Sequence, residues 1–259
     1  MTVNESNVFL DQLLSQTRMP APILQMARDW TASRKHWAGP LAVDSPTDLA
    51  GLIDHTLLKP VAKPSDIERL CSEAATHRFK SVCVNPCHVG RAAASLKDHG
   101  VLVCTVIGFP LGATTPSAKA FETSEAIASG ATEIDMVINQ GAVLAGDWDM
   151  VRRDIDAVVR ASSGLTVKVI IETCNLNEEA KIGACLASCL SGASFVKTST
   201  GFGADGATEH DISLMRAVVG SGLSVKASGG IRTTADALKM VAAGANRIGA
   251  SASVAIIGA

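Results

Sequence analysis

The sequence predicts an α/β fold in which eight parallel strands close into a barrel, and three observations lead to this prediction. The chain has 259 residues, close to the roughly 250 that such a barrel needs. From residue 50 onward, eight short apolar runs alternate with segments of helical periodicity. No G-x-G-x-x-G follows the first run, where a doubly wound dinucleotide-binding sheet would carry it. We therefore expect a (β/α)8 TIM barrel with an N-terminal helical extension.

The expected strands are short runs rich in β-branched residues. They are residues 51–55, 80–84, 101–109, 132–139, 165–173, 194–198, 223–227 and 247–250. Consecutive strands that a helix connects are parallel and cross over right-handedly, so eight such units form either a closed barrel or an open sheet. The number eight favours the barrel.

Three of the intervening helices have capping patterns at their starts, in which a Ser or Thr is followed three residues later by an acidic residue. The pairs are Ser65 with Glu68, Thr208 with Asp211, and Thr233 with Asp236. Gly244 is expected to end the last of these helices with a left-handed residue.

Residues 1–48 do not follow the strand–helix repeat. They hold Leu10, Leu13, Leu14, Ile23, Leu24, Met26, Trp30 and Trp37, and they end at a Gly-Pro pair. We expect a helical extension packed on the barrel domain of residues 49–259. A homodimer contact is a second, weaker hypothesis for the same residues.

Composition argues against several classes of partner. The net charge of −2 gives no bulk attraction for nucleic acid or an anionic membrane, and no run approaches the length of a membrane helix. We expect a soluble, cytoplasmic protein that uses no cofactor. The seven cysteines are scattered, and Cys83 and Cys87 lack a second ligand pair at zinc spacing, so no metal site is expected.

Three lysines interrupt apolar strands at equal spacing. Lys168, Lys197 and Lys226 lie 29 residues apart, each after a valine, so successive strand–helix units place them near a common barrel mouth. One such lysine alone would be read as a packed stem with its head in water. Two ammonium groups ~4 Å apart repel by ~4 kcal/mol at an effective dielectric near 20. That repulsion would lower the pKa of one lysine by about 3.

A neutral amine in an apolar pocket attacks carbonyl carbons, which is the starting point of Schiff-base catalysis. Asp135 and Asp54 are carboxylates inside other apolar runs, and each would either shuttle protons or pair with a lysine. The residues alone do not choose among the three lysines.

The loops after the last three strands combine glycines with hydroxyls, which suits phosphate binding through backbone N–H groups. The candidates are Gly201, Gly229, Gly230, Gly249 and Ser251. A small phosphorylated aldehyde or sugar is the expected substrate.

Seven motifs resemble the deoxyribose-phosphate aldolase family over residues 51–254. They are IDHTLLKP, SVCVNP, TVIGFPLG, EIDMVIN, KVIIET, VKTSTGF and VKASGGIR. The resemblance implies a metal-independent class I aldolase of deoxyribonucleotide catabolism, which cleaves 2-deoxy-D-ribose 5-phosphate reversibly to D-glyceraldehyde 3-phosphate and acetaldehyde. It implies that Lys197 forms the Schiff base and that Lys226 eases loss of its proton. Asp135 would transfer protons with a water, and the five glycine and serine candidates would bind phosphate.

This sequence departs from some members of the family, which carry a lysine at the position of Phe202 and a serine at that of Ala252. It also contains no tyrosine, whereas other members end in one that is thought to assist proton transfer. Two alternatives stay open: a sugar-phosphate isomerase barrel without a covalent intermediate, and a barrel that only binds a metabolite.

Overall fold

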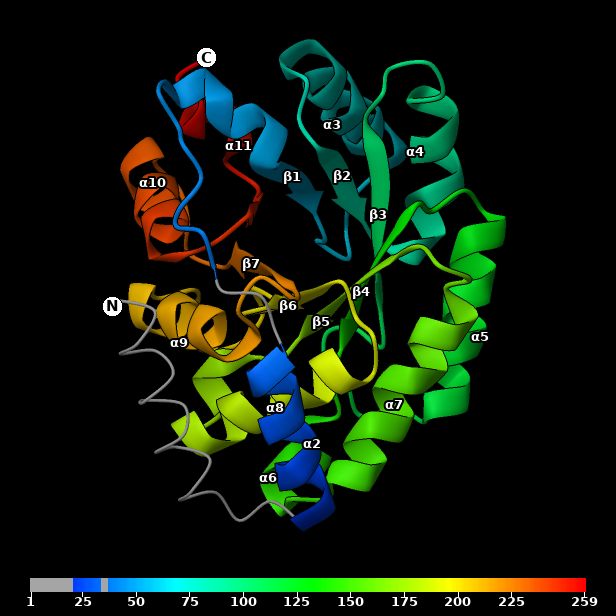
Figure 1. The fold of residues 1–259 in the computed structure, drawn as a ribbon. Coiled ribbons are helices and arrows are strands. Elements are labelled where there is room, and N and C mark those ends of the chain that lie inside the picture. Colours follow the sequence, from blue (N-terminus) through cyan, green and yellow to red (C-terminus); the bar gives the residue numbers. More distant parts are fainter. Residues whose placement is uncertain (1–20, 34–36) are drawn as a thin grey trace.

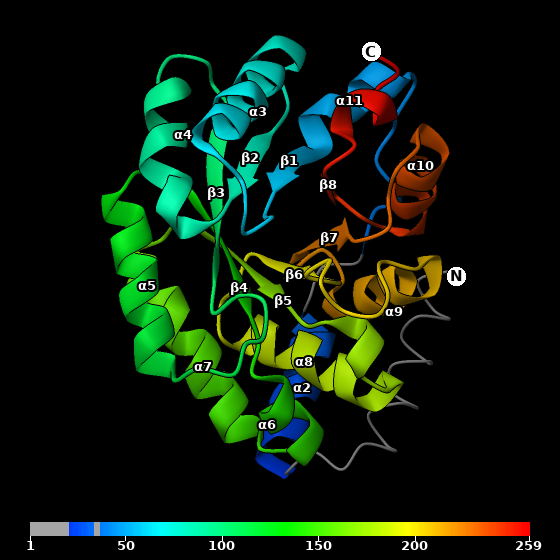
Figure 2. The same cartoon turned by 180° about the vertical axis from the view of Figure 1, so that it is seen from behind.

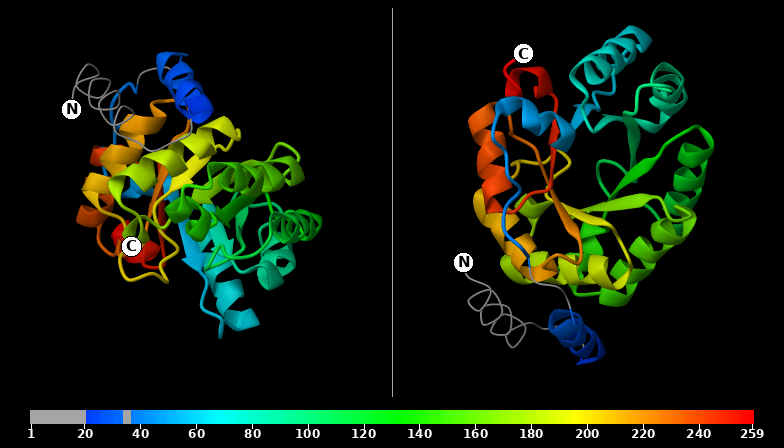
Figure 3. Two further views of the ribbon diagram at one scale, coloured as in Figure 1. Left: turned by 90° about the horizontal axis from the view of Figure 1, so that it is seen from below. Right: turned by 45° about the horizontal axis from the view of Figure 1, so that its top comes forward.

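The computed structural model describes residues 21–33 and 37–259 and confirms the predicted barrel. Eight strands form one closed parallel sheet in the order β1-β2-β3-β4-β5-β6-β7-β8, and β8 pairs with β1. Helices surround the strands on the outside (Figure 1, and from behind in Figure 2). The tilted view in Figure 3 shows the ring of helices around the open end of the barrel.

All eight predicted strands are present, with bounds that differ by a few residues from the prediction. They are β1 Ile53–Leu57, β2 Ser81–Val84, β3 Leu102–Ile107, β4 Glu133–Val137, β5 Thr166–Ile170, β6 Phe195–Lys197, β7 Ser224–Ser228 and β8 Arg247–Ala250. The expected runs were longer mainly because the residues that follow several strands are also apolar or hydroxylated, although they belong to the loops at the barrel mouth.

The helices follow the strands in alternation. They are α3 Pro64–His77, α4 Val89–Ser95, α5 Pro116–Ala128, α6 Gln140–Ala145, α7 Trp148–Ala161, α8 Glu178–Leu190, α9 Glu209–Val219, α10 Thr234–Ala243 and α11 Ser253–Ile256. Short 3-10 turns occur at η1 Pro46–Leu52, η2 Pro86–His88 and η3 Thr173–Asn175. No helix within residues 21–33 and 37–259 combines the length and hydropathy that a membrane span requires.

Two of the three predicted capping pairs are confirmed. The hydroxyls of Thr208 and Thr233 accept from the backbone N–H three residues later. The third prediction was wrong, because Pro64 takes the first helical position of α3 and Ser65 lies inside the first turn. The Asp66 carboxylate accepts from the N–H of Lys63 at 2.9 Å, so it caps this helix. Gly244 ends α10 at a positive φ of 121°.

Alternation along each strand divides side chains between two layers. In β5, Val167 and Val169 belong to the large apolar cluster that packs the strands against the helices. Lys168 lies between them and turns into the barrel, where it meets side chains from β3 and β4. The barrel interior therefore holds polar groups together with a small cluster of Leu58, Cys83, Cys104 and Val106, while the large apolar core forms a shell around it.

Part of the expected N-terminal extension is helical. Helix α2 covers Ala21–Ser33 and contacts α8, which agrees with its position beside α8 in Figure 1. Its Leu24 and Trp30 pack on the main core, and the ring of Trp37 lies 5.6 Å from the Arg216 guanidinium. Leu10, Leu13 and Leu14 lie outside the described residues. The domain boundary at residue 48 and the dimer contact stay predictions.

Candidate active site

The barrel places all three lysines in one buried cluster, as their spacing predicted. Lys197 pairs in register with Lys226 across β6 and β7, and Lys168 pairs with Asp135 across β5 and β4. Residues in register on adjacent strands point to the same face. The four side chains therefore meet inside the barrel.

Asp135 is the centre of this cluster. Its Oδ2 accepts from Nζ of Lys197 at 2.7 Å and from Nζ of Lys226 at 2.8 Å. Its Oδ1 accepts from Nζ of Lys168 at 2.8 Å and from the Cys104 thiol at 3.0 Å. The side chains of Asp135, Lys168 and Lys226 are fully buried, and Lys197 keeps 3% of its surface exposed.

Two further carboxylates and one guanidinium extend the network toward the amino ends of the strands. Lys226 bonds to Asp54, and Lys168 bonds to Glu133 at 2.7 Å. Arg247 bridges Asp54 and Glu133 at 2.7 Å and 3.0 Å. The network thus holds four cationic side chains and three carboxylates, which leaves one cation without a matching negative charge.

These carboxylates change the expected electrostatics of the lysines. Burial alone would lower the pKa of Lys226, but Asp135 and Asp54 outweigh it and raise that pKa above its usual value. Lys168 behaves in the same way, chiefly through Asp135, and its pKa is raised as well. Repulsion was predicted to lower the pKa of one of the three lysines, and this does not hold for Lys168 or Lys226. The reason is that carboxylates from other strands lie between the lysines, a placement that could not be predicted from the sequence.

The carboxylates respond in the opposite sense. Burial would raise the pKa of Asp135, yet the three ammonium groups hold it well below its usual value. Burial likewise opposes ionisation of Asp54, whose pKa is nevertheless lowered by Lys226, Lys168 and Arg247. Both carboxylates therefore stay ionised inside the barrel, and both pair with lysines, which was one of the two roles expected of them.

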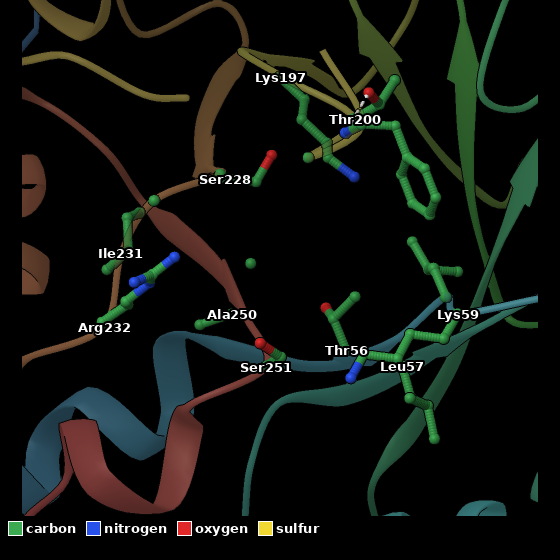
Figure 4. Close-up of a pocket in the computed structure, with 16 residues that line it drawn as sticks. Thr56, Leu57, Lys59, Lys197, Thr200, Ser228, Ile231, Arg232, Ala250 and Ser251 are labelled. Atoms are coloured by element: carbon green, nitrogen blue, oxygen red, sulfur yellow. Dashed lines mark hydrogen bonds between the residues drawn. The ribbon is translucent and has the colours of Figure 1, made fainter. Parts of the chain in front are cut away.

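A pocket of about 310 Å³ opens at the carboxyl ends of β1, β6, β7 and β8. All of the predicted phosphate-binding residues line it: Gly201, Gly229, Gly230, Gly249 and Ser251. Lys197 lines the same pocket and reaches into it from β6 (Figure 4). Asp135 and Lys226 are not among the lining residues and contact the pocket through Lys197 and its neighbours.

The glycines of this pocket differ in their local roles. Gly201 and Gly230 have φ values of 84° and 79° and open space where a Cβ would stand. Gly249 lies inside β8, and a Cβ there would come within 3.0 Å of Lys226 Cε. This close approach shows that Gly249 makes room for the buried lysine, a role that the sequence did not reveal.

The sequence also missed several lining residues. Arg232, from the loop after β7, directs its guanidinium toward the hollow, and Thr56 of β1 and Lys59 from the loop after β1 line it as well (Figure 4). These residues lie in the motifs VKASGGIR and IDHTLLKP, and an arginine two residues after a double glycine could have marked the first of them. Phe202 also lines the pocket, and its ring meets Phe109 edge-on with centroids 5.3 Å apart.

Among the described residues, two groups of buried side chains have the spacing of metal ligands. In one of them, formed by Asp54, Cys104 and Glu133, both carboxylates bond to cationic side chains. Ligand atoms of Cys83, Cys104 and Asp135 lie within 4.8 Å of one another. Both oxygens of Asp135 already accept from ammonium groups, and the three lysines make this position unfavourable for a cation. The cluster is therefore better suited to hydrogen bonding than to holding a metal.

A closed parallel barrel with ionisable groups and glycine loops at the carboxyl ends of its strands is the architecture of a barrel enzyme with an anion-binding pocket. Comparison with known proteins then gives the family. The sequence profile of DeoC/LacD family aldolases matches residues 49–258, and the chain belongs to this family. It is therefore an aldolase, a carbon–carbon lyase.

Individual relatives agree with this assignment. A deoxyribose-phosphate aldolase from Bacillus cereus strain AH187 is 59% identical over 211 residues, which cover 81% of this chain and 95% of that protein. The deoxyribose phosphate aldolase from Aeropyrum pernix, described as a unique tetrameric structure, is 34% identical with a TM-score of 0.78, over 92% of this chain and 97% of that one. A Coccidioides immitis structure, provisionally assigned as a deoxyribose-phosphate aldolase, is 38% identical with a TM-score of 0.84, over 100% of this chain and 97% of that one.

Proposed function

We propose that this aldolase cleaves 2-deoxy-D-ribose 5-phosphate reversibly to D-glyceraldehyde 3-phosphate and acetaldehyde, through a Schiff base on Lys197. The observation that carries the proposal is the position of Lys197. Of the three clustered lysines it alone lines the pocket, and its Nζ also lies 2.7 Å from Asp135. Lys168 and Lys226 are fully buried, with their ammonium groups bound to two or more carboxylates.

The charge count supports an amine at Lys197. The network holds one cation more than its carboxylates balance, so it can lose one proton and become neutral. The carboxylates raise the pKa of Lys168 and Lys226. Of the three lysines, Lys197 is the one that reaches the substrate pocket.

The reaction then follows from the chemistry of imines. The Lys197 amine adds to the C1 carbonyl carbon, and the carbinolamine loses water to give a protonated imine. The C3 hydroxyl gives up its proton, the C2–C3 bond breaks, and its electron pair moves to C2, which leaves an enamine on Lys197 and releases D-glyceraldehyde 3-phosphate. Protonation at C2 and hydrolysis then release acetaldehyde and restore the amine.

Asp135 is suited to assist these proton transfers together with a water. Its ionised carboxylate lies within hydrogen-bond reach of the Lys197 nitrogen, so it can accept and return a proton at the carbinolamine and enamine steps. Lys226 would assist by its positive charge beside the same oxygen.

The substrate phosphate would lie at the glycine loops. The N–H groups of Gly201, Gly229 and Gly230 donate to no other group within the described residues. Arg232 adds a cationic side chain to this part of the pocket, where Phe202 occupies a position that is lysine in some members of the family.

Reductive trapping tests the residue assignment. Sodium borohydride in the presence of acetaldehyde should leave one ethyl group on the peptide that carries Lys197 and abolish cleavage. Lys197→Leu should prevent trapping, whereas Lys97→Leu, an exposed control, should leave it intact. An isomerase without a covalent intermediate, or a protein that only binds the sugar phosphate, would give no adduct. An adduct on Lys168 or Lys226 would also contradict the proposal.

A further inference from the structure

The carboxylate of Glu172, in the loop after β5, forms hydrogen bonds with the loop after β6, and residues of that second loop line the pocket. Glu172 is only 2% exposed, and its Oε1 accepts from the Thr200 N–H at 3.2 Å. Its Oε2 accepts from the Thr200 hydroxyl at 2.5 Å. The same hydroxyl oxygen accepts from the Phe202 N–H at 3.0 Å, so one carboxylate organises both sides of Gly201.

The backbone conformation of Glu172 indicates that the surrounding structure holds this residue in one position. Its φ of 56° lies in the left-handed region, which a residue with a Cβ adopts only when its surroundings hold it there. The loop also packs tightly on this side chain, since a Cβ on Gly203 would come within 3.2 Å of the Glu172 carboxyl carbon. A buried carboxylate is costly unless donors surround it, and here Thr200 supplies them.

The opposite side of the loop is fixed by β7. The Thr198 hydroxyl donates to the Ser228 carbonyl at 3.0 Å and accepts from the Ser228 N–H at the same distance. The Ser228 hydroxyl donates to the Ser199 carbonyl at 2.5 Å. Residues 198–200 are therefore held from both sides of the loop, and the N–H of Gly201, the next residue, donates to no group among the described residues.

We propose that Glu172 is a positioning residue for substrate binding, which acts through Thr200 to hold the Gly201 N–H in place for a phosphate group. This inference rests on the proposed function for its substrate. Glu172 itself does not line the pocket, whereas Thr200, Gly201 and Phe202 do. Its carboxylate therefore does not face the substrate phosphate and does not repel it directly. Its hydrogen bonds to Thr200 determine the position of the loop after β6.

The test uses Glu172→Gln, which keeps the shape of the side chain but loses its charge. Hydrogen bonds to an ionised acceptor are about twice as strong as those to a neutral one, so we expect KM for 2-deoxy-D-ribose 5-phosphate to rise about tenfold, with kcat within about twofold. The dissociation constant for inorganic phosphate, followed by calorimetry, should rise by a similar factor. Borohydride trapping of acetaldehyde, which has no phosphate, should be unchanged.

Thr200 variants show whether the effect passes through that residue. Thr200→Val removes the hydroxyl and should raise KM as much as Glu172→Gln does. Thr200→Ser keeps a hydroxyl, so its KM should stay within about twofold of the native value. In a protein that already carries Thr200→Val, the further change Glu172→Gln should raise KM only slightly more. Glu178→Gln, at an exposed position of α8, is the matched control.

Three results would overturn the proposal. One is unchanged phosphate affinity in Glu172→Gln. The second is a parallel loss of phosphate binding, acetaldehyde trapping and thermal stability, which would show a general structural role. The third is full additivity of Glu172→Gln and Thr200→Val. Phosphate binding is measured without turnover, so a failure of the proposed reaction would be distinguished from a failure of this inference.

Discussion

Replacing Lys226 by leucine should move imine formation to higher pH. In the native cluster, the ammonium groups of Lys226 and Lys197 bond the same oxygen of Asp135, at 2.8 Å and 2.7 Å. Lys226 also bonds Asp54. Removal of Lys226 leaves three cations facing three carboxylates, so the network then needs the positive charge of Lys197 for balance.

The size of the shift follows from the geometry. Two nitrogens bound to one oxygen at these distances are at most about 5.5 Å apart, and unit charges at that separation repel by ~3 kcal/mol at an effective dielectric of 20. This energy corresponds to about 2 pH units. Because the pocket admits water and counterions, we expect the midpoint of imine formation to rise by about 1–2 units.

The assay is the pH dependence of acetaldehyde trapping under single-turnover conditions. Lys226→Arg, which keeps the charge, should leave the midpoint within about half a unit of the native value, and Lys97→Leu serves as the surface control. Thermal melts would establish that each variant is folded. An unchanged midpoint in folded Lys226→Leu would refute the reasoning, since the charge of Lys226 would then have no influence on the reactive amine.

Two further predictions concern the pocket and the ion network. Arg232→Gln should raise KM for 2-deoxy-D-ribose 5-phosphate about tenfold or more and leave acetaldehyde trapping intact; an unchanged KM would exclude Arg232 from phosphate binding. Asp135→Asn should destabilise the fold by about 3–5 kcal/mol at pH 7 in urea unfolding, because it leaves buried cations unpaired. The ammonium groups lower the pKa of Asp135, so its contribution is complete above its unfolded pKa of about 4 and is lost as the pH falls through the folded value. The stability difference between native and Asn proteins should therefore narrow below about pH 4, and a difference that stays constant there would contradict this linkage.

The strands could be predicted because their causes are local. Valine on either side of Lys168 and β-branched residues throughout the eight runs favour strands whatever lies elsewhere in the chain. The ends of helices were predicted less accurately where neighbouring residues compete for the same capping position. At α3, Pro64 occupies the first helical position, so the predicted cap at Ser65 did not form. The positions of carboxylates relative to lysines depend on strand order, so they were left open.

Loop residues were predicted unevenly for a similar reason. The predicted glycines were recognisable from composition, and all four line the pocket, three in the loops after β6 and β7 and Gly249 within β8. Glu172 has no distinctive spacing, because its partner Thr200 lies in the loop after another strand. Gly249 was assigned to the pocket, yet its closest neighbour is Lys226, a contact that only packing could reveal.

The sequence by itself determined the alternation of eight strands with helices and the gathering of Lys168, Lys197 and Lys226 on one face of the barrel. The repeat of 29 residues brings Lys197 and Lys226 into register, and Lys168 lies two residues before the register partner of Lys197 and therefore on the same face. Only the tertiary structure decided which lysine meets the pocket and which are neutralised. That outcome depends on Asp135 from β4 and on Asp54 from β1, and Asp54 comes beside Lys226 because β8 closes on β1. Coulomb energies depend on the distance between charges in space and not on their separation along the chain. No local sequence pattern could therefore have predicted which carboxylate pairs with which lysine.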